Sequence, residues 1–359
     1  MKYEEEYRTI QDINELDNLQ SGDRVFIPRG DHHVTVPAKD GQSDSSIKYL
    51  FGLSRLTDVK IKGERGTRIF TGANPAEISQ DSLCLISIRH CSDIEISDIE
   101  IIGEGRQKFI EGENESWRGG FGIGFQFSER ITLERVHARD FQTHFDFHVC
   151  SEVVMDSCRS SGIAIPALFR FRESKRFLVT HFRGTPDYDG FANPGQKQRE
   201  EVDQANKFQT FSMGGWIVHG CEDGLICDYD VTGCAQEALV IEGERIKRIR
   251  CQKIRLGHSR WGFVMRGGSG CYINNMEIRN CWRCGLMLRG DHDHVVNNHF
   301  KNIRVHNCGR LRDDGVDDRE SIHEGKNAHD NTFEDYSVTF DEQTPWPRPN
   351  AGVRLAGDP

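Results

Sequence analysis

A short apolar strand, a turn and a second short apolar strand recur along this chain every 22 to 24 residues. The clearest copies end in Leu239–Gly243, Phe263–Gly267 and Leu286–Gly290. A period of this length that is made of strands rather than helices is typical of a solenoid, in which each coil buries its apolar face by stacking on its neighbours. The repeat therefore predicts one elongated domain rather than two globular ones.

The repeat divides the chain into a cap, a body and a tail. In residues 1–22, Ile13 and Leu16 fall at helical spacing, which predicts a short helix that seals the first coil. Strand patterns with the repeat period then fill residues 23–340. Four prolines interrupt residues 341–359, which excludes a central strand and predicts a C-terminal cap or a loose tail.

Three repeats are longer than the others, and the extra residues fall at the same turn of the coil each time. These insertions lie near 104–119, 183–209 and 309–326, and they are polar. Insertions on one side of a solenoid form the wall of a groove, and such loops usually carry the function. We therefore expect a functional groove on the strands that follow this turn.

The composition disfavours several classes of protein. A formal net charge of −10 argues against sequence-independent binding to nucleic acid, since neutralising phosphates needs a basic surface. No apolar run approaches the roughly 18 residues of a membrane helix. Met1–Glu6 is acidic where a secretory signal would be basic, so we expect a cytoplasmic protein unless a leader has been removed. The twelve cysteines recur at related repeat positions, such as Cys227 and Cys251, which predicts free, buried thiols.

The first strand and its surroundings, Gly22–Gly30, followed by short strands at this period, resemble the right-handed parallel β-helix proteins of the pectate-lyase-like superfamily. The resemblance covers about residues 20–340 and implies an all-β, right-handed parallel β-helix. It also implies carbohydrate as the partner, because members are mostly polysaccharide lyases, glycoside hydrolases, uronate epimerases and phage tailspikes. It leaves the reaction open. A homotrimer is compatible with solenoids of this kind, and the sequence does not decide the oligomeric state.

Alternation along the strands predicts which side chains face outward. We expect the apolar pairs of each repeat to point inward, from Phe125/Phe127 and Phe145/Phe147 to Phe211/Met213 and Leu286/Leu288. One outward column is then Gln126, Asp146, Arg170, Ser212, Val240, Val264 and Met287, and a second is Ser128, His148, Arg172, Gly214, Glu242, Arg266 and Arg289. Adjacent rungs lie about 4.8 Å apart, so Asp146, His148, Arg170 and Arg172 should form one cluster.

This cluster favours an anionic ligand, because guanidinium groups bind carboxylates in a planar, two-bonded geometry. A uronic acid fits that demand. For β-elimination or epimerisation, arginine would hold the C5 carboxylate while His148, oriented by Asp146, removes the C5 proton. His258 and Arg260 are alternates for the base and the clamp. We predict catalytic roles for Asp146, His148, Arg170, Arg172, Glu242 and Arg266, and substrate contacts from Gln126, Glu237, His258, Arg260, Arg289, Asp187 and Asp189.

Two other functions stay open. A glycoside hydrolase or glycosyl transferase needs two carboxyl groups between roughly 5 and 9.5 Å apart. Asp146 and Glu242 lie three rungs apart, about 14 Å, which is too far. The second acid would come from the insertion or from the turn before Glu242, where Asp187, Asp189, Glu200, Glu201, Asp203 and Glu237 are available. The other alternative is a glycan-binding solenoid without catalysis, like a tailspike.

The sequence indicates no cofactor and no metal site. Asp291–His294 holds two imidazoles and two carboxylates, but it lies at a junction between coils without a regular ligand frame. A polar surface turn is the better interpretation.

Overall fold

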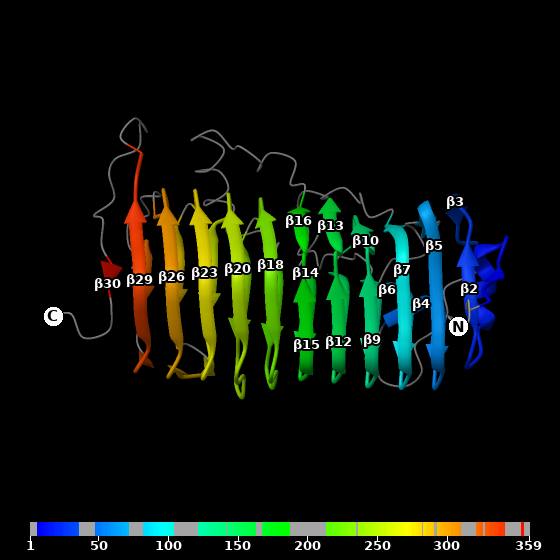
Figure 1. The fold of residues 1–359 in the computed structure, drawn as a ribbon, viewed down its shortest axis with the longest axis horizontal. Coiled ribbons are helices and arrows are strands. Elements are labelled where there is room, and N and C mark those ends of the chain that lie inside the picture. The colour runs from blue at the N-terminus through cyan, green and yellow to red at the C-terminus, as the bar shows by residue number, and fades with distance from the viewer. Residues whose placement is uncertain are drawn as a thin grey trace, which may run out of the picture.

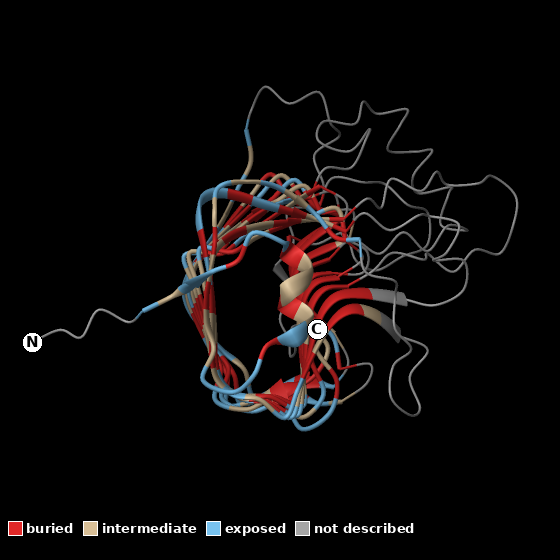
Figure 2. Ribbon diagram, turned by 90° about the vertical axis from the view of Figure 1, so that its right-hand side faces the viewer, coloured by how far each residue is buried: buried red, intermediate tan, exposed pale blue. Residues whose placement is uncertain are grey.

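The computed structural model describes residues 6–35, 47–71, 82–103, 121–141, 143–162, 167–186, 213–234, 236–281, 283–290, 293–309, 321–325, 327–341 and 353–354. Across these residues, strands of successive coils pair in parallel and form two long sheets and one short one (Figure 1). Seen along the long axis, the coils superimpose, and the sheets form the walls around a common interior (Figure 2). The prediction of an all-β parallel β-helix is confirmed.

The 16-stranded sheet contains the strands that run along most of the molecule in Figure 1. They are β1 (Arg8–Thr9), β2 (Arg24–Ile27), β3 (Gly30–His33), β5 (Thr57–Phe70), β7 (Ser92–Ile102), β9 (Glu129–Glu134), β10 (His137–Arg139), β12 (Ser151–Asp156), β13 (Arg159–Gly162), β15 (Lys175–Thr180), β16 (Arg183–Pro186), β18 (Leu225–Thr232), β20 (Arg250–Gly257), β23 (Tyr272–Arg279), β26 (His299–His306) and β29 (Thr332–Thr339).

The 11-stranded sheet forms another wall of the same coils. Its strands are β4 (Ile47–Ser54), β6 (Ser82–Arg89), β8 (Phe121–Gln126), β11 (Thr143–His148), β14 (Ala167–Arg172), β17 (Met213–Val218), β19 (Glu237–Glu242), β21 (Trp261–Met265), β24 (Cys284–Leu288), β27 (Ile322–Glu324) and β30 (Val353–Arg354). The three-stranded sheet contains β22 (Gly268–Ser269), β25 (Val295–Val296) and β28 (Ala328–His329).

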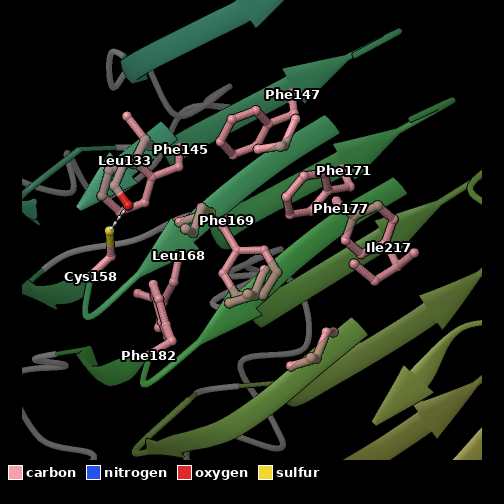
Figure 3. Close-up of a cluster of buried hydrophobic side chains, with 14 of the residues drawn as sticks. Leu133, Phe145, Phe147, Cys158, Leu168, Phe169, Phe171, Phe177, Phe182 and Ile217 are labelled. Carbon is pink, nitrogen blue, oxygen red and sulfur yellow. Dashed lines mark hydrogen bonds between the residues drawn. The ribbon is translucent and has the colours of Figure 1, made fainter. Parts of the chain in front are cut away.

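The interior is filled by side chains that stack along the axis. The rings of Phe125, Phe147, Phe171 and Phe177 follow one another with centroids 5.0, 4.5 and 4.3 Å apart, and three of them are labelled in Figure 3. The rings bury their faces against one another, so neighbouring coils stabilise each other.

The cysteines are all free, and all but Cys227 are buried, as predicted. Several help to close one turn of the coil: the backbone N–H of Cys150 donates to Ser174 Oγ at 3.1 Å, and Cys91 does the same to Ser128. The expected equivalence of Cys227 and Cys251 is wrong, because Cys251 pairs with Ile226.

The chain ends differ from the expectation in detail. The predicted capping helix is a 3₁₀ helix, η1 (Ile13–Asn18), capped by the Asp12 side chain, which accepts a hydrogen bond from the Asn14 N–H. Its Ile13 and Leu16 are buried, as a cap requires. Within the predicted tail, β30 pairs with β27 and ends the 11-stranded sheet, so the tail contributes an edge strand.

Two of the three predicted insertions include residues that belong to strands. The stretch 183–186 is strand β16, and 322–324 is strand β27. The remaining parts, 104–119, 187–209 and 310–320, lie outside the described residues. Each interval comes directly before a strand of the 11-stranded sheet, namely β8, β17 and β27, which matches the expected position in the coil. Among the described residues, no helix has the length and apolar character needed to cross a membrane.

Candidate functional site

Most of the predicted site residues that the structure describes lie on the side of the 11-stranded sheet that faces away from the core, which we call the outer face. In β14, Leu168 and Phe169 both belong to the core, so Ala167 before them and Arg170 after them point outward. This break in alternation gives the outer face three rows. They are Phe121, Thr143, Ala167, Met213, Glu237, Trp261 and Cys284; then Gly124, Asp146, Arg170, Trp216, Val240, Val264 and Met287; then Gln126, His148, Arg172, Val218, Glu242, Arg266 and Arg289.

His148 and Arg172 are direct neighbours in the third row, on adjacent strands β11 and β14. Partial burial lowers the pKa of His148, and the positive charge of Arg172 lowers it further. The opposing effects of Asp146 and Glu173, whose carboxylate lies 3.7 Å from His148 Nε2, are smaller. His148 is therefore a neutral base at neutral pH. Among the residues that the structure describes, no carboxylate lies within ion-pair distance of Arg172.

Asp146 and Arg170 form a buried, two-bonded ion pair in the middle row. Arg170 Nε and Nη2 donate to the two carboxylate oxygens at 2.7 and 3.0 Å. The guanidinium also lies 5.8 Å from the Phe121 ring centroid and 5.7 Å from that of Trp216. These contacts fix Arg170 and neutralise its charge. The predicted cluster of four is therefore confirmed in position, but Asp146 binds Arg170 and does not orient His148.

Glu237, Arg266 and Glu242 form a second charged cluster farther along the outer face. Arg266 Nη2 donates to Glu237 at 2.5 Å, and Arg266 Nη1 donates to Glu242 at 3.2 Å. Burial raises the pKa of Glu237, and the nearby Arg266 only partly offsets this. The sequence analysis placed Glu237 at a turn, whereas it is the first residue of strand β19.

The other residues that were predicted to contact the substrate lie in different places. Arg260 is buried and lies 4.4 Å from the Trp261 ring centroid, with Arg283 on the next rung 5.4 Å from the same ring. His258 is exposed on the turn after β20, and Arg289 is exposed at the end of its row. Asp187, Asp189 and Ser212 lie outside the described residues.

The predicted columns are wrong on two strands. In β8 the inward pair is Ile123 and Phe125, so Gln126 stands beside His148 rather than Asp146. Phe127 is 49% exposed on a turn with φ 51°, and Ser128 is buried. The segment FGIGFQF (residues 121–127) fits two registers, because its glycines do not show which alternate positions face the core.

On β17 the error has the same origin. Met213 points outward with Ala167 and Val240, while Gly215 and Ile217 take the inward positions. Trp216 and Val218 therefore occupy the places that were expected for Ser212 and Gly214. Glu173 and Trp216 were missed by the sequence analysis, and a search for large aromatics in outward columns would have found Trp216.

The outer face also holds buried polar atoms without hydrogen-bond partners. Among the described residues these include Thr143 Oγ1, Arg172 Nε, Trp216 Nε1, Glu237 Oε2 and Trp261 Nε1. Unpaired buried polar atoms are rare in native proteins, and each costs about 1–3 kcal/mol. Their concentration on one face indicates a surface built to meet a polar ligand. The described ranges contain no group of three or more His, Cys, Asp or Glu that could hold a metal ion.

Comparison with solved structures identifies the fold. A hyperthermoactive exopolygalacturonase from Thermotoga maritima matches 91% of this chain and 83% of its own, with 11% identity and a TM-score of 0.52. The chain has the parallel β-helix fold of the pectate-lyase-like proteins. A family 28 exopolygalacturonase from Yersinia enterocolitica matches 92% of the chain and 72% of its own, at 13% identity and a TM-score of 0.48.

A catalytic domain of a GH87 α-1,3-glucanase, in complex with nigerose, matches 94% of the chain at 11% identity and a TM-score of 0.46. The chain spans 66% of the length of that domain, just under two thirds. No protein-family model matches the sequence, and no curated protein matches it.

Proposed function

We propose that the protein is a carbohydrate-active enzyme that acts on a uronate-containing glycan, and that His148 removes the C5 proton of a uronate held by Arg172. The observation that carries this proposal is the pairing of a neutral imidazole with an arginine that has no carboxylate partner among the described residues. An exopolygalacturonase built on the same fold supports carbohydrate as the substrate class.

The two groups divide the work that C5-proton removal needs. A uronate carboxylate must be neutralised before its neighbouring C–H becomes acidic, and the planar fork of Arg172 suits a carboxylate. His148, on the adjacent rung, then accepts the proton as a neutral base. In β-elimination the C5–H electron pair becomes the C4=C5 double bond, and the glycosidic oxygen leaves C4 and takes a proton from water. In epimerisation a proton returns to C5 on the opposite face.

Hydrolysis is the second candidate, because Glu237 and Glu242 bind the same guanidinium. Two hydrogen bonds to one guanidinium hold the bonded carboxylate oxygens no more than about 8 Å apart, so the pair is not too widely separated for glycoside hydrolysis. The raised pKa of Glu237 suits a general acid, and Glu242 would serve as base or nucleophile. Asp146 and Glu242 are too far apart to act together in hydrolysis, whereas Glu237 and Glu242 are not.

Product analysis separates the two reactions. The protein is incubated with a panel of acidic and neutral oligosaccharides, and ultraviolet absorbance and reducing ends are followed together. C5-proton removal with elimination gives an absorbing unsaturated uronate in step with each new reducing end. Reducing ends without absorbance, lost in Glu237→Gln but kept in His148→Ala, would replace the first proposal by the second. Binding of a glycan without any product would leave a carbohydrate-binding solenoid.

A further inference from the structure

We propose that Trp216 is the platform for a neutral sugar residue that adjoins the uronate held by Arg172, so that the substrate is a mixed glycan rather than a polyuronate. This inference rests on the proposed function and names its substrate class. It comes from the composition of one rung, strand β17, which lies between the two charged clusters of the outer face.

The position of Trp216 suits a stacking platform. It pairs with Arg170 on one side and Val240 on the other, so its strand lies one rung, about 4.8 Å, from that of Arg172 and two rungs from that of His148. Ala167, Met213 and Val240 pack against the indole, and the Arg170 guanidinium lies 5.7 Å from its centroid. The indole is therefore packed against its neighbours, while the residue stays partly exposed.

The charges around this rung disfavour a second carboxylate. The outward side chains of β17 are Met213, Trp216 and Val218, and none of them is charged. Arg170, the nearest cation in the middle row, is already neutralised by Asp146. Glu242 follows Val218 in the third row and shares the Arg266 guanidinium with Glu237, so this cluster has no spare positive charge for a second uronate. A neutral pyranose meets no such penalty and buries its apolar ring face on the indole.

The indole also has an unused donor. Trp216 Nε1 is buried and has no hydrogen-bond acceptor among the described residues. A buried donor without an acceptor is costly, and a sugar hydroxyl would supply the missing acceptor. The site thus offers an apolar ring and one N–H donor, which is the pattern by which tryptophan recognises a group that is apolar on one side and polar at its edge.

Isothermal titration calorimetry with two oligosaccharides of equal length tests this inference. One contains a uronate next to a neutral sugar, and the other contains uronates only. Titrations use His148→Ala protein, so that neither ligand is consumed. Trp216→Ala and Trp216→Phe are then added to this background, with Tyr272→Ala as a matched control that removes an exposed aromatic from the 16-stranded sheet.

We expect the mixed ligand to bind more tightly, and Trp216→Ala to weaken it about tenfold while the polyuronate changes little. Trp216→Phe keeps the ring and should lose only part of the affinity, which shows that the protein is still folded, and Tyr272→Ala should have no effect. Equal binding of the mixed ligand by Trp216→Ala, or a preference for the polyuronate, would overturn the inference. If Arg172→Ala abolishes binding of both ligands and Trp216→Ala affects neither, this inference fails and the proposed function stands. If neither ligand binds at all, both fail.

Discussion

The two long sheets of this β-helix present charged residues to the outside in different ways. On the 16-stranded sheet, Arg130 binds Asp93 at 2.7 Å. Just before strands β18 and β20 of this sheet, Arg248 binds Asp223 at 2.6 Å, and all four side chains are at least 44% exposed. On the 11-stranded sheet, Asp146, Glu237 and their arginine partners are largely buried. The first set is solvated, whereas the second has been removed from water.

This difference shows that charge on an outward column does not mark a site by itself. Exposed ion pairs contribute little to stability and are common on protein surfaces. Buried charges, a carboxyl with a raised pKa and polar atoms without partners are costly, and they concentrate at functional sites. Both sheets are built by the same repeat, so the greater share of these costs on the 11-stranded sheet supports the proposal that this face carries the function.

The largest expected effect is the loss of activity when Arg172 is removed. Arg172→Ala should lower turnover about 10²- to 10³-fold, because the carboxylate of the bound uronate loses the positive charge that stabilises it. Arg172→Lys should restore part of the rate. Arg176→Ala, which breaks an exposed ion pair with Glu152 on the other sheet, is the matched control and should keep the parent rate. Comparable losses in both alanine variants would remove the distinction between the faces.

The next effect concerns stability. Arg266→Met leaves Glu237 and Glu242 near one another without the cation between them, so we expect the free energy of unfolding to fall by about 3 kcal/mol. Because protonation of Glu237 relieves this repulsion, the loss should shrink as the pH falls. Urea unfolding at two pH values measures both. An unchanged midpoint would show that the cluster is solvated like those of the other sheet.

A smaller effect is expected in the pH dependence of the reaction. Only neutral His148 accepts a proton, so activity falls as the pH drops through its pKa, which is lowered from the ordinary value near 6.5. The parent should therefore stay active below pH 6.5. Arg172→Gln removes one cause of the shift, so its acidic limb should move to higher pH, measured relative to its own plateau. If the acidic limb of the pH profile does not move, another group causes it.

The smallest effect is expected on the 16-stranded sheet. Arg248→Met removes an exposed partner of Asp223, and the urea midpoint should not change measurably, because solvent already screens this pair. A shift as large as that of Arg266→Met would mean that burial does not separate the two faces.

The repeat made the fold and most of the register predictable. A period of 22 to 24 residues fixes which residues stack, and Asp146, His148, Arg170 and Arg172 come together as expected because residues 145–148 and 169–172 alternate regularly. Strands with glycine at alternating positions, such as β8, gave no unique register.

The partners of the charged side chains could not be predicted. Strict alternation along β19 would place Glu237 inward. The sequence does not show that Ala238 and Leu239 both turn toward the core, which leaves Glu237 on the outer face. The pairing of Asp146 with Arg170 instead of His148 depends on side-chain rotamers and on the rings of Phe121 and Trp216. Burial on the outer face likewise has no signature in the sequence.

Exchange of the uronate C5 hydrogen with solvent tests the account most directly. A uronate oligosaccharide is incubated in D₂O with the parent, His148→Ala, Arg172→Ala and Arg130→Ala, and deuterium at C5 or loss of the C5 signal is followed by NMR. We predict rapid change with the parent and Arg130→Ala, and little with the two variants of the 11-stranded sheet. Equal rates in all four proteins, or cleavage that leaves the C5 hydrogen in place, would contradict the account.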